Sequence, residues 1–227
     1  MKKALKILAS KFGYKVERVK SDTADYYHKQ QYLESNEFKY ILWLDRVYQK
    51  IERVPGVIVE LGVAYGRNAI IFSKLADGYG QGDTRKYYGF DTFSGYTEYS
   101  LLQDEHLSSK TWKQNSKEKV ISRLARADVL RKCELIEGDI SKEVPKFAKR
   151  NKNLKIALLY VDCNAYQPAI DGLRALFPFM VPGSVICVDE KLPGSETRAL
   201  YDFCEEAGLR VCRDAGSFAV PAYTLVS

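Results

Sequence analysis

Short apolar runs alternate with segments of helical periodicity along the chain from residue 57 onward. The runs IALLYV at 156–161 and SVICV at 184–188 are almost continuously apolar, which is typical of strands buried on both faces of a sheet. Between such runs, apolar residues recur every three or four positions, which predicts amphipathic helices. The predicted strands are residues 57–61, 87–91, 133–136, 156–161, 185–188, 209–213 and 218–226.

Predicted helices follow most of these strands. Ser116 and Ser195 stand where the N-cap residues of two of them are expected. This alternation predicts βαβ units with right-handed crossovers, and therefore an α/β fold whose mostly parallel sheet has helices on both faces. Pro221 lies inside the last predicted strand and cannot donate to a strand ladder, so either a bulge lies there or the strand begins after it. The predicted helices are residues 67–76, 116–127, 166–177 and 195–207, with a short helix between 136 and 156.

The 227 residues suit one α/β domain with an extension. Residues 1–55 contain long helical stretches rich in tyrosine and charge, and we expect an N-terminal helical extension that caps the core formed by residues 56–227. Residues 93–115 are polar and irregular, and a loop of this length is usually functional. We expect it to be a lid.

The positive charge is concentrated at the N-terminus. The first twenty residues hold seven lysines and arginines and one acid, so they account for the whole net charge of +6. This distribution does not indicate a nucleic-acid-binding body, and we expect no nucleic-acid partner. Leu5, Leu8 and Phe12 recur at roughly helical spacing between lysines. This arm could be a membrane-surface helix, pack on a second subunit of a homo-oligomer, or be a solvated face, and we favour the last two.

No apolar run reaches the roughly 18–20 residues that a membrane span needs, and the start lacks a secretory cleavage site. The five cysteines are odd in number and lack the spacing of metal ligands. Buried thiols in a reducing compartment are the simplest interpretation, so we expect a cytoplasmic protein.

Ligands of open α/β sheets bind beyond the carboxyl ends of the strands. The first strand ends in VIVELGVAYGRN, where Glu60, Gly62 and Gly66 form a glycine turn into a helix. Glycines allow the chain to turn tightly and a ligand to approach the backbone. The tighter G-x-G-x-x-G pattern is absent, which argues against a dinucleotide-dependent oxidoreductase.

Acidic residues follow the other strands. Asp91 ends the second strand, where an acid is placed to accept hydrogen bonds from ribose hydroxyls. Asp139 follows the third strand, Asp162 the fourth, and Asp189 and Glu190 the fifth. Neighbouring strands would bring the last three carboxylates to one crevice. There they would suit Mg²⁺, or raise one another's pKa and yield a general base.

These residues, with the pieces FDTFSG, EGDI, ALLYVDCNAY and VPGSVICVDE, resemble the class I S-adenosylmethionine-dependent methyltransferases. More specifically, they are similar to the macrocin/mycinamicin O-methyltransferase family (the TylF, MycF and NovP type) over about residues 50–215. The resemblance implies a Rossmann-like, mostly parallel seven-stranded sheet. It also implies O-methylation of a sugar hydroxyl on a nucleotide-linked or glycoside substrate, assisted by a divalent metal.

The resemblance implies roles for matching positions. Asp162 would be the general base, and His106 in the loop is an alternative, although we favour plain solvent exposure for it. Tyr96, Tyr99 and Trp112 are candidates to stack on a sugar face. The residues expected to bind Mg²⁺ are Asp162, Asp189 and Glu190. Those expected to border S-adenosylmethionine are Glu60, Gly62, Val63, Ala64, Gly66, Asp91, Thr92, Asp139, Ile140 and Asp162.

The chain departs from the family pattern in three places. Asn164 stands where a second acid is usual, Glu190 replaces an aspartate, and Arg67 and Asn68 follow the glycine turn in place of a small residue. The acceptor and the metal dependence therefore stay open. The alternatives are C-methylation of a nucleotide ketosugar, O-methylation of a catechol-type acceptor, and a non-catalytic cofactor-binding partner subunit. The intact strand-end acids argue against the last.

Overall fold

The computed structural model describes residues 35–104, 107–109, 113, 115–189, 195–214 and 223–226. The chain divides into two compact units, Met1–Phe38 and Lys39–Ser227. The second unit contains the whole sheet. The basic arm lies outside the described residues, so its membrane, oligomeric or solvated role stays a prediction.

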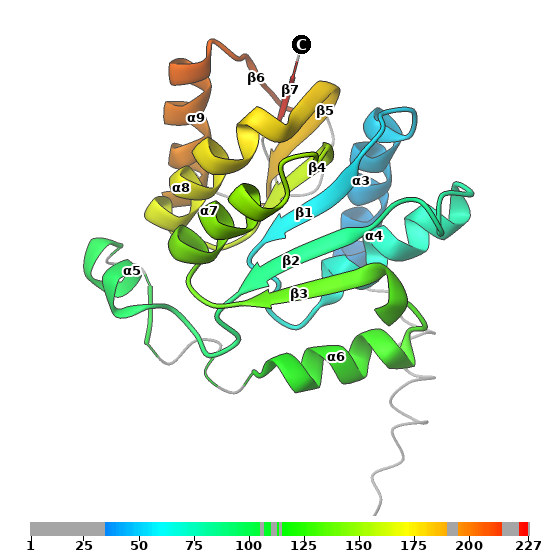
Figure 1. Cartoon of the computed structure of the whole chain (residues 1–227), viewed down its shortest axis with the longest axis horizontal. Helices are drawn as coiled ribbons and strands as arrows, with labels where there is room; N and C mark the ends of the chain where they lie inside the picture. Colours follow the sequence, from blue (N-terminus) through cyan, green and yellow to red (C-terminus); the bar gives the residue numbers. More distant parts are fainter. Residues whose placement is uncertain are drawn as a thin grey trace, which may run out of the picture. The chain divides into compact units, whose positions relative to one another are not determined.

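Seven strands form one sheet in the order β3-β2-β1-β4-β5-β7-β6 (Figure 1). Strands β1 to β5 are parallel, whereas β7 runs antiparallel to both β5 and β6. The mostly parallel seven-stranded sheet is therefore confirmed. The strands are β1 (Val57–Leu61), β2 (Tyr87–Asp91), β3 (Cys133–Glu137), β4 (Ile156–Val161), β5 (Met180–Val188), β6 (Val211–Cys212) and β7 (Tyr223–Leu225).

Helices cover both faces of this sheet, as the alternation predicts (Figure 1). On one face lie α3 (Ser35–Ile51), α4 (Arg67–Gly78) and α6 (Lys117–Arg126). On the other lie α7 (Ile140–Arg150), α8 (Tyr166–Leu176) and α9 (Ser195–Ala207). The remaining elements are α5 (Glu98–Gln103) and the 3₁₀ turns Leu130–Lys132 and Phe177–Phe179.

The central strand β4 divides the core into two clusters. All six of its residues are buried. Leu158 and Tyr160 pack with the residues of α3, α4 and α6, whereas Leu159 and Val161 pack with those of α7, α8 and α9. Full burial of one large apolar side chain contributes roughly 1.5–3 kcal/mol. Packing on both faces therefore fixes β4 and the position of the residue that follows it, Asp162.

Helix α3 is part of this core from Lys39 onward. Trp43 and Leu44 are fully buried among the side chains of the first cluster. The end of the helix is held by Arg85, whose guanidinium donates to the carbonyls of Ile51 at 3.0 Å and Val54 at 2.8 Å. A cation that binds the last carbonyls of a helix satisfies acceptors that the helix leaves free.

Several local predictions can be compared with the structure. Ser116 caps α6, since its hydroxyl accepts from the amide of Lys119 at 3.4 Å. Ser195 is the first residue of α9, and its hydroxyl donates to Asp104. The described part of strand β7 begins at Tyr223, and Pro221 lies outside the described residues, so the choice between a bulge and a later start stays open. Strand β5 begins earlier than predicted, and the expected loop contains α5.

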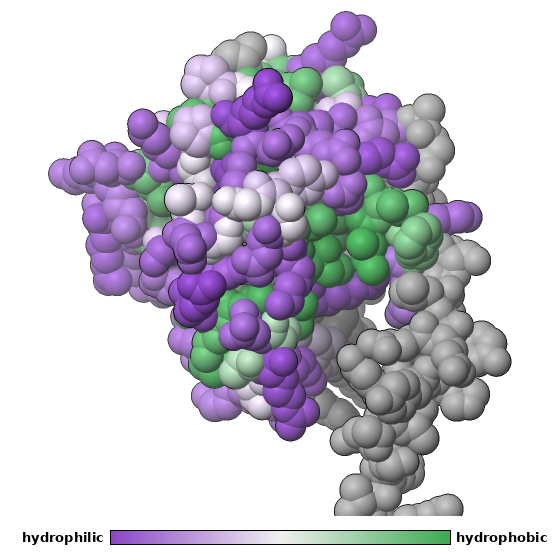
Figure 2. Space-filling view, turned by 90° about the vertical axis from the view of Figure 1, so that its right-hand side faces the viewer, coloured by the Kyte–Doolittle hydropathy of each residue, from purple (hydrophilic) through white to green (hydrophobic). Residues whose placement is uncertain are grey.

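The surface in Figure 2 is mainly hydrophilic, with a smaller apolar area within the same face. A mainly polar exterior is expected where helices turn their apolar stripes toward the sheet. In the part of the chain that the structure describes, no helix combines the length and apolar character needed to cross a membrane.

Candidate active site

Hydrogen bonds continue past the ends of the parallel strands and bring their tips together. The amide of Gly62 donates to the carbonyl of Phe90 at 2.8 Å, and the amide of Asp162 donates to Leu61 at 2.8 Å. Gly62 has a φ of +93°, and a Cβ there would lie 2.1 Å from the carbonyl oxygen of Asp162. Only glycine fits this close approach of β1 and β4. The tips of β1, β2 and β4 therefore lie side by side.

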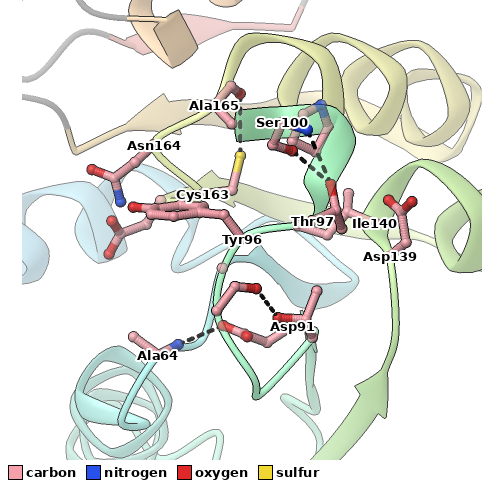
Figure 3. Close-up of a pocket in the computed structure, with 15 residues that line it drawn as sticks. Ala64, Asp91, Tyr96, Thr97, Ser100, Asp139, Ile140, Cys163, Asn164 and Ala165 are labelled. Carbon is pink, nitrogen blue, oxygen red and sulfur yellow. Dashed lines mark hydrogen bonds between the residues drawn. The ribbon is translucent and has the colours of Figure 1, made fainter. Parts of the chain in front are cut away.

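A cavity that is partly open to solvent lies at this edge of the sheet (Figure 3). Its walls come from the β1–α4 turn, the end of β2, the segment leading into α5, the start of α7 and the β4–α8 turn. The expected cofactor residues in its wall are Gly62, Ala64, Asp91, Thr92, Asp139, Ile140 and Asp162. Gly95, Tyr96, Thr97, Ser100, Cys163, Asn164, Ala165 and Pro168 complete it.

Asp91 holds the glycine turn as well as lining the cavity. One carboxylate oxygen accepts from the amides of Val63 at 2.9 Å and Ala64 at 2.8 Å. The other accepts from the amide of Phe93 at 2.7 Å. Burial raises the pKa of Asp91, and these three backbone bonds partly offset the rise. The Thr92 side chain also hydrogen-bonds to this carboxylate, so Asp91 fixes the glycine turn while it faces the cavity.

The β1–α4 turn is fixed from its other side by Asn115. The side-chain amide of Asn115 donates to the carbonyl of Ala64, whose φ is +46°. A positive φ is costly for a residue other than glycine, and such strain persists where surrounding contacts determine it. Sequence reasoning missed Asn115, because no local pattern shows that the end of the 93–115 segment meets the first strand.

Asp139 lines the cavity and caps a helix. Its carboxylate accepts from the amide of Ser141 at 3.0 Å, which makes it the N-cap of α7. Ile140, the first helical residue, lies next to it in the cavity wall. Asp139 therefore has a structural role at the start of α7, and its contact with the cofactor stays a prediction.

The segment around α5 closes one side of the cavity and is held by Asp104. The Asp104 carboxylate accepts from the amide of Tyr166 at 2.9 Å and from the hydroxyl of Ser195. Helix α8 has Ala165 as its N-cap and no side-chain cap of its own, so Asp104 supplies that bond from another part of the chain. Sequence reasoning did not single out Asp104.

The aromatic candidates of this segment differ in their positions. Tyr96 lines the cavity (Figure 3), whereas the side chain of Tyr99 is 53% exposed and is not part of the cavity wall. Trp112 and the alternative base His106 lie outside the described residues. The stacking role of Tyr96 stays a prediction.

Three of the expected cofactor residues lie behind the cavity wall. Glu60 is fully buried, and its carboxylate accepts from Asn68 at 2.7 Å and from the Tyr87 hydroxyl. Burial raises the pKa of Glu60 well above its usual range, against the lowering effect of Asn68. Val63 contributes its amide to Asp91. Gly66 has a φ of +82°, and a Cβ there would lie 2.8 Å from Val120, so it makes room for α6.

Asp162 brings acidic charge to the cavity wall. Burial raises its pKa well above the usual range, and the charges of Asp189, Glu196 and Glu60 raise it further, whereas a hydrogen bond from Asn68 lowers it. In the described part of the chain, no lysine or arginine forms an ion pair with Glu60, Asp162 or Asp189. A desolvated acidic cluster of this kind favours a cationic ligand.

The expected metal site is not formed by the described residues. Asp189 lies near Asp162, but its carboxylate accepts from the hydroxyls of Tyr40 at 2.8 Å and Tyr160 at 3.2 Å and does not line the cavity. Glu190 lies outside the described residues. Among the residues that are described, no group of three or more histidines, cysteines, aspartates or glutamates could hold a metal ion.

The model of one protein family, macrocin-O-methyltransferase (TylF), matches residues 43–211, which is well over half of the chain. The chain belongs to the macrocin O-methyltransferase (TylF) family. The match covers every strand of the parallel part of the sheet and all the acids at the strand tips. The fold is accordingly the Rossmann-like methyltransferase fold that the sequence motifs predict.

Solved structures of other methyltransferases have the same fold as this TylF-family chain. The calicheamicin methyltransferase CalS11 is 24% identical with a TM-score of 0.74, over 98% of this chain and 90% of that chain. Its apo structure, described as a TDP-rhamnose 3'-O-methyltransferase, is 26% identical with a TM-score of 0.68, over 92% and 88%.

Two further similar structures are O-methyltransferases. NovP is 20% identical with a TM-score of 0.69, over 81% of this chain and 79% of that chain. TomG from Streptomyces achromogenes, in complex with S-adenosylmethionine, is 17% identical with a TM-score of 0.55, over 99% and 96%. A sequence search of curated proteins finds no match to the chain.

Proposed function

We propose that this TylF-family protein transfers the methyl group of S-adenosylmethionine to a sugar hydroxyl of a nucleotide-linked or glycoside acceptor. The observation that carries the proposal is the cavity at the strand tips, which combines Asp91, the N-terminus of α7 and the half-buried carboxylate of Asp162. The sugar acceptor is supported by CalS11, which is described as a TDP-rhamnose 3'-O-methyltransferase. The TomG complex supports S-adenosylmethionine as the methyl donor.

The proposed cofactor would lie along the tips of β1, β2 and β3. Asp91 lines the cavity at the end of β2, where its carboxylate would accept a hydrogen bond from a ribose hydroxyl. Asp139 and Ile140 would frame the adenine at the start of α7. The methionine end would approach Gly62, where the cationic sulfonium and ammonium groups would meet the acidic cluster. This arrangement offsets the cost of burying those acids.

The chemistry needs alignment and a proton acceptor. A lone pair of the acceptor oxygen attacks the methyl carbon, the methyl–sulfur bond breaks, and S-adenosylhomocysteine leaves with the electron pair on sulfur. The hydroxyl proton passes to Asp162, which lines the cavity. The raised pKa of Asp162 makes it a stronger base than an exposed aspartate. Alignment of two bound reactants alone can contribute several kcal/mol.

Metal assistance belongs to the proposal only in outline. Asp162 and Asp189 could supply two carboxylate oxygens to Mg²⁺, with Glu190 as the third ligand that the family resemblance implies. A bound divalent cation would orient the acceptor and lower the pKa of its hydroxyl. The described residues do not form such a site. The five free cysteines suit the reducing cytoplasm as the protein's compartment.

The test is methyl transfer from labelled S-adenosylmethionine to a panel of acceptors: TDP-rhamnose and other nucleotide sugars, a nucleotide ketosugar and a catechol. We expect transfer to a sugar hydroxyl. Asp162→Asn should lower kcat by about 10²-fold or more, because general-base catalysis contributes 10²–10⁴-fold, while S-adenosylhomocysteine still binds in calorimetry. The same assay in excess EDTA decides whether a metal takes part.

The possible outcomes separate the alternatives. Label on the catechol or on a sugar carbon would replace the proposed acceptor but keep the methyltransferase. Cofactor binding with no transfer to any acceptor would favour a non-catalytic partner subunit. Full turnover by Asp162→Asn would remove the proposed base, and unchanged turnover in EDTA would remove the metal.

A further inference from the structure

Asn68 is a polar residue where the family pattern has a small one, and its side chain is only 6% exposed. It is the second residue of α4, directly after the glycine turn. A buried side-chain amide carries two N–H donors and one carbonyl acceptor, each of which is costly to leave without a partner. The partners of Asn68 come from three different elements.

The amide nitrogen of Asn68 donates to Oε1 of Glu60 at 2.7 Å and to Oδ2 of Asp162 at 3.2 Å. Its carbonyl oxygen accepts from the hydroxyl of Tyr40 at 2.8 Å. The ionised form of Asp162, which the proposed base requires, can only accept hydrogen bonds, so the amide nitrogen of Asn68 and not its oxygen faces this carboxylate. One side chain thus connects strand β1, the tip of β4 and helix α3.

Tyr40 is itself held in place. Its hydroxyl also lies 2.8 Å from Oδ2 of Asp189, and the guanidinium of Arg67 lies 4.1 Å from the centre of its ring. A guanidinium at this distance over a tyrosine face is attracted to the ring. Because a phenol has one donor hydrogen, Tyr40 donates either to Asn68 or to Asp189 and holds the two side chains within hydrogen-bonding distance of the same oxygen. Arg67 and Asn68 follow the glycine turn in place of the expected small residue. Both contact this network, Arg67 through the ring of Tyr40 and Asn68 through Asp162.

We propose that Asn68 is a positioning residue that holds the carboxylate of Asp162 in the cavity wall, oriented toward the acceptor hydroxyl. This inference rests on the proposed function and adds to it. Asn68 is not part of the cavity wall, so it acts through Asp162 and does not touch the substrate. Without its donated bonds, repulsion from the neighbouring acids would turn Asp162 away. Productive geometry has to be kept within roughly 0.5 Å.

The predicted effect lies in kcat and not in cofactor affinity. Hydrogen bonds to a charged group are strong enough that loss of this one should lower kcat by about ten- to hundredfold. The KM for S-adenosylmethionine should change by less than about threefold, because Asn68 does not line the cavity. Tyr40→Phe should give a smaller fall in the same direction. The double variant should lose less than the product of the two single effects, because Tyr40 acts through Asn68.

The experiment compares Asn68→Ala and Tyr40→Phe with Ser73→Ala as a matched control. Ser73 is a buried polar residue of the same helix, and its hydroxyl contacts Cys133 at 3.4 Å and not the carboxylate of Asp162. Each variant is assayed for kcat and KM with TDP-rhamnose and labelled S-adenosylmethionine, and for its melting temperature. A wild-type kcat in Asn68→Ala, or an equal loss in Ser73→Ala at the same melting temperature, would overturn the proposal.

Asn68→Asp separates the donated bonds from the space that the side chain fills. It keeps the size and the oxygen that faces Tyr40 but removes both donors, so we expect activity as low as in Asn68→Ala. Near-normal activity would contradict the proposal.

A crystal structure of Asn68→Ala with S-adenosylhomocysteine tests the proposal without any acceptor. The Asp162 side chain should adopt a new rotamer in this variant. An unchanged rotamer would also overturn the proposal. If the wild-type protein methylates no acceptor, the proposed function fails, and this structure still decides the role of Asn68.

Discussion

At the scale of single residues, the acids at the strand tips have unequal roles. Asp91 and Asp162 line the cavity, whereas Glu60 and Asp189 accept hydrogen bonds from protein donors behind it. The sequence predicts that all four lie at one edge of the sheet, since each follows or ends a parallel strand. It does not predict which carboxylate faces the cavity, because that depends on partners such as Asn68 that lie far away along the chain.

Glu60 makes stability depend on pH in a direction that can be tested. Burial raises its pKa in the folded protein, so the folded state holds this proton more tightly than the unfolded state. The stabilisation is complete below the unfolded pKa of about 4.3 and is lost as the pH rises through the folded pKa. Glu60→Gln removes this dependence, which amounts to at most about 1.4 kcal/mol per pH unit.

Urea unfolding of both proteins between pH 5 and pH 8 measures the effect. We expect the free energy of unfolding of the wild type, relative to that of Glu60→Gln, to fall as the pH rises. Parallel profiles for the two proteins would mean that Glu60 does not hold a proton in the folded state over this range.

At the scale of elements, the first strand, the second strand and the fourth strand have the bounds that their apolar runs predict. Strand β5 extends back to Met180, through residues that are partly exposed and carry no apolar pattern. Helix α5 was missed because it has only six residues inside a polar segment, although Thr97 caps it by accepting from the amide of Ser100 at 3.1 Å. Periodicity needs longer segments than this to give a signal.

The closing of the α5 segment depends on Asp104. Asp104→Ala removes the bonds to the amide of Tyr166 and the hydroxyl of Ser195. Each lost bond should destabilise the closed position of this segment by about 1.5–3 kcal/mol, because the acceptor in both bonds is a charged carboxylate. S-adenosylhomocysteine should bind more weakly, and limited proteolysis should cleave residues 93–115 faster.

Glu98→Ala is the matched control, since Glu98 is an exposed acid of the same helix. It should leave both the cleavage rate and the cofactor affinity unchanged. Equal behaviour of Asp104→Ala and the wild type would show that other contacts hold this segment.

At the scale of the whole sheet, the C-terminal strand lies between two others. Thr224 is fully buried, and it pairs with Ile186 of β5 on one side and with Val211 of β6 on the other. Strand β7 comes last in the sequence. The sheet order shows that, among the described residues, it is the strand that pairs with the side of β5 facing away from β4. Strand β6 depends on it for its pairing.

Thr224→Pro should therefore destabilise the protein strongly, although Thr224 lies near the end of the chain, where substitutions are usually tolerated. Proline cannot donate to the ladder, and a buried acceptor left without a partner costs about 1–3 kcal/mol. Leu225→Thr, at a side chain that is 48% exposed, keeps the amide and should cost little. Thermal unfolding of the two variants measures the difference, and similar melting temperatures would contradict the structural role of β7.

The sequence alone determined the alternation of strands and helices, the glycine turn and the acids that end the strands, because these depend on residues close together along the chain. Tertiary structure decided which of those acids share a cavity and what holds them. The bond from Asn68 to Asp162 spans 94 positions, and that from Tyr40 to Asp189 spans 149. Contacts of that separation leave no trace in local periodicity, since they exist only once the helices have packed on the sheet.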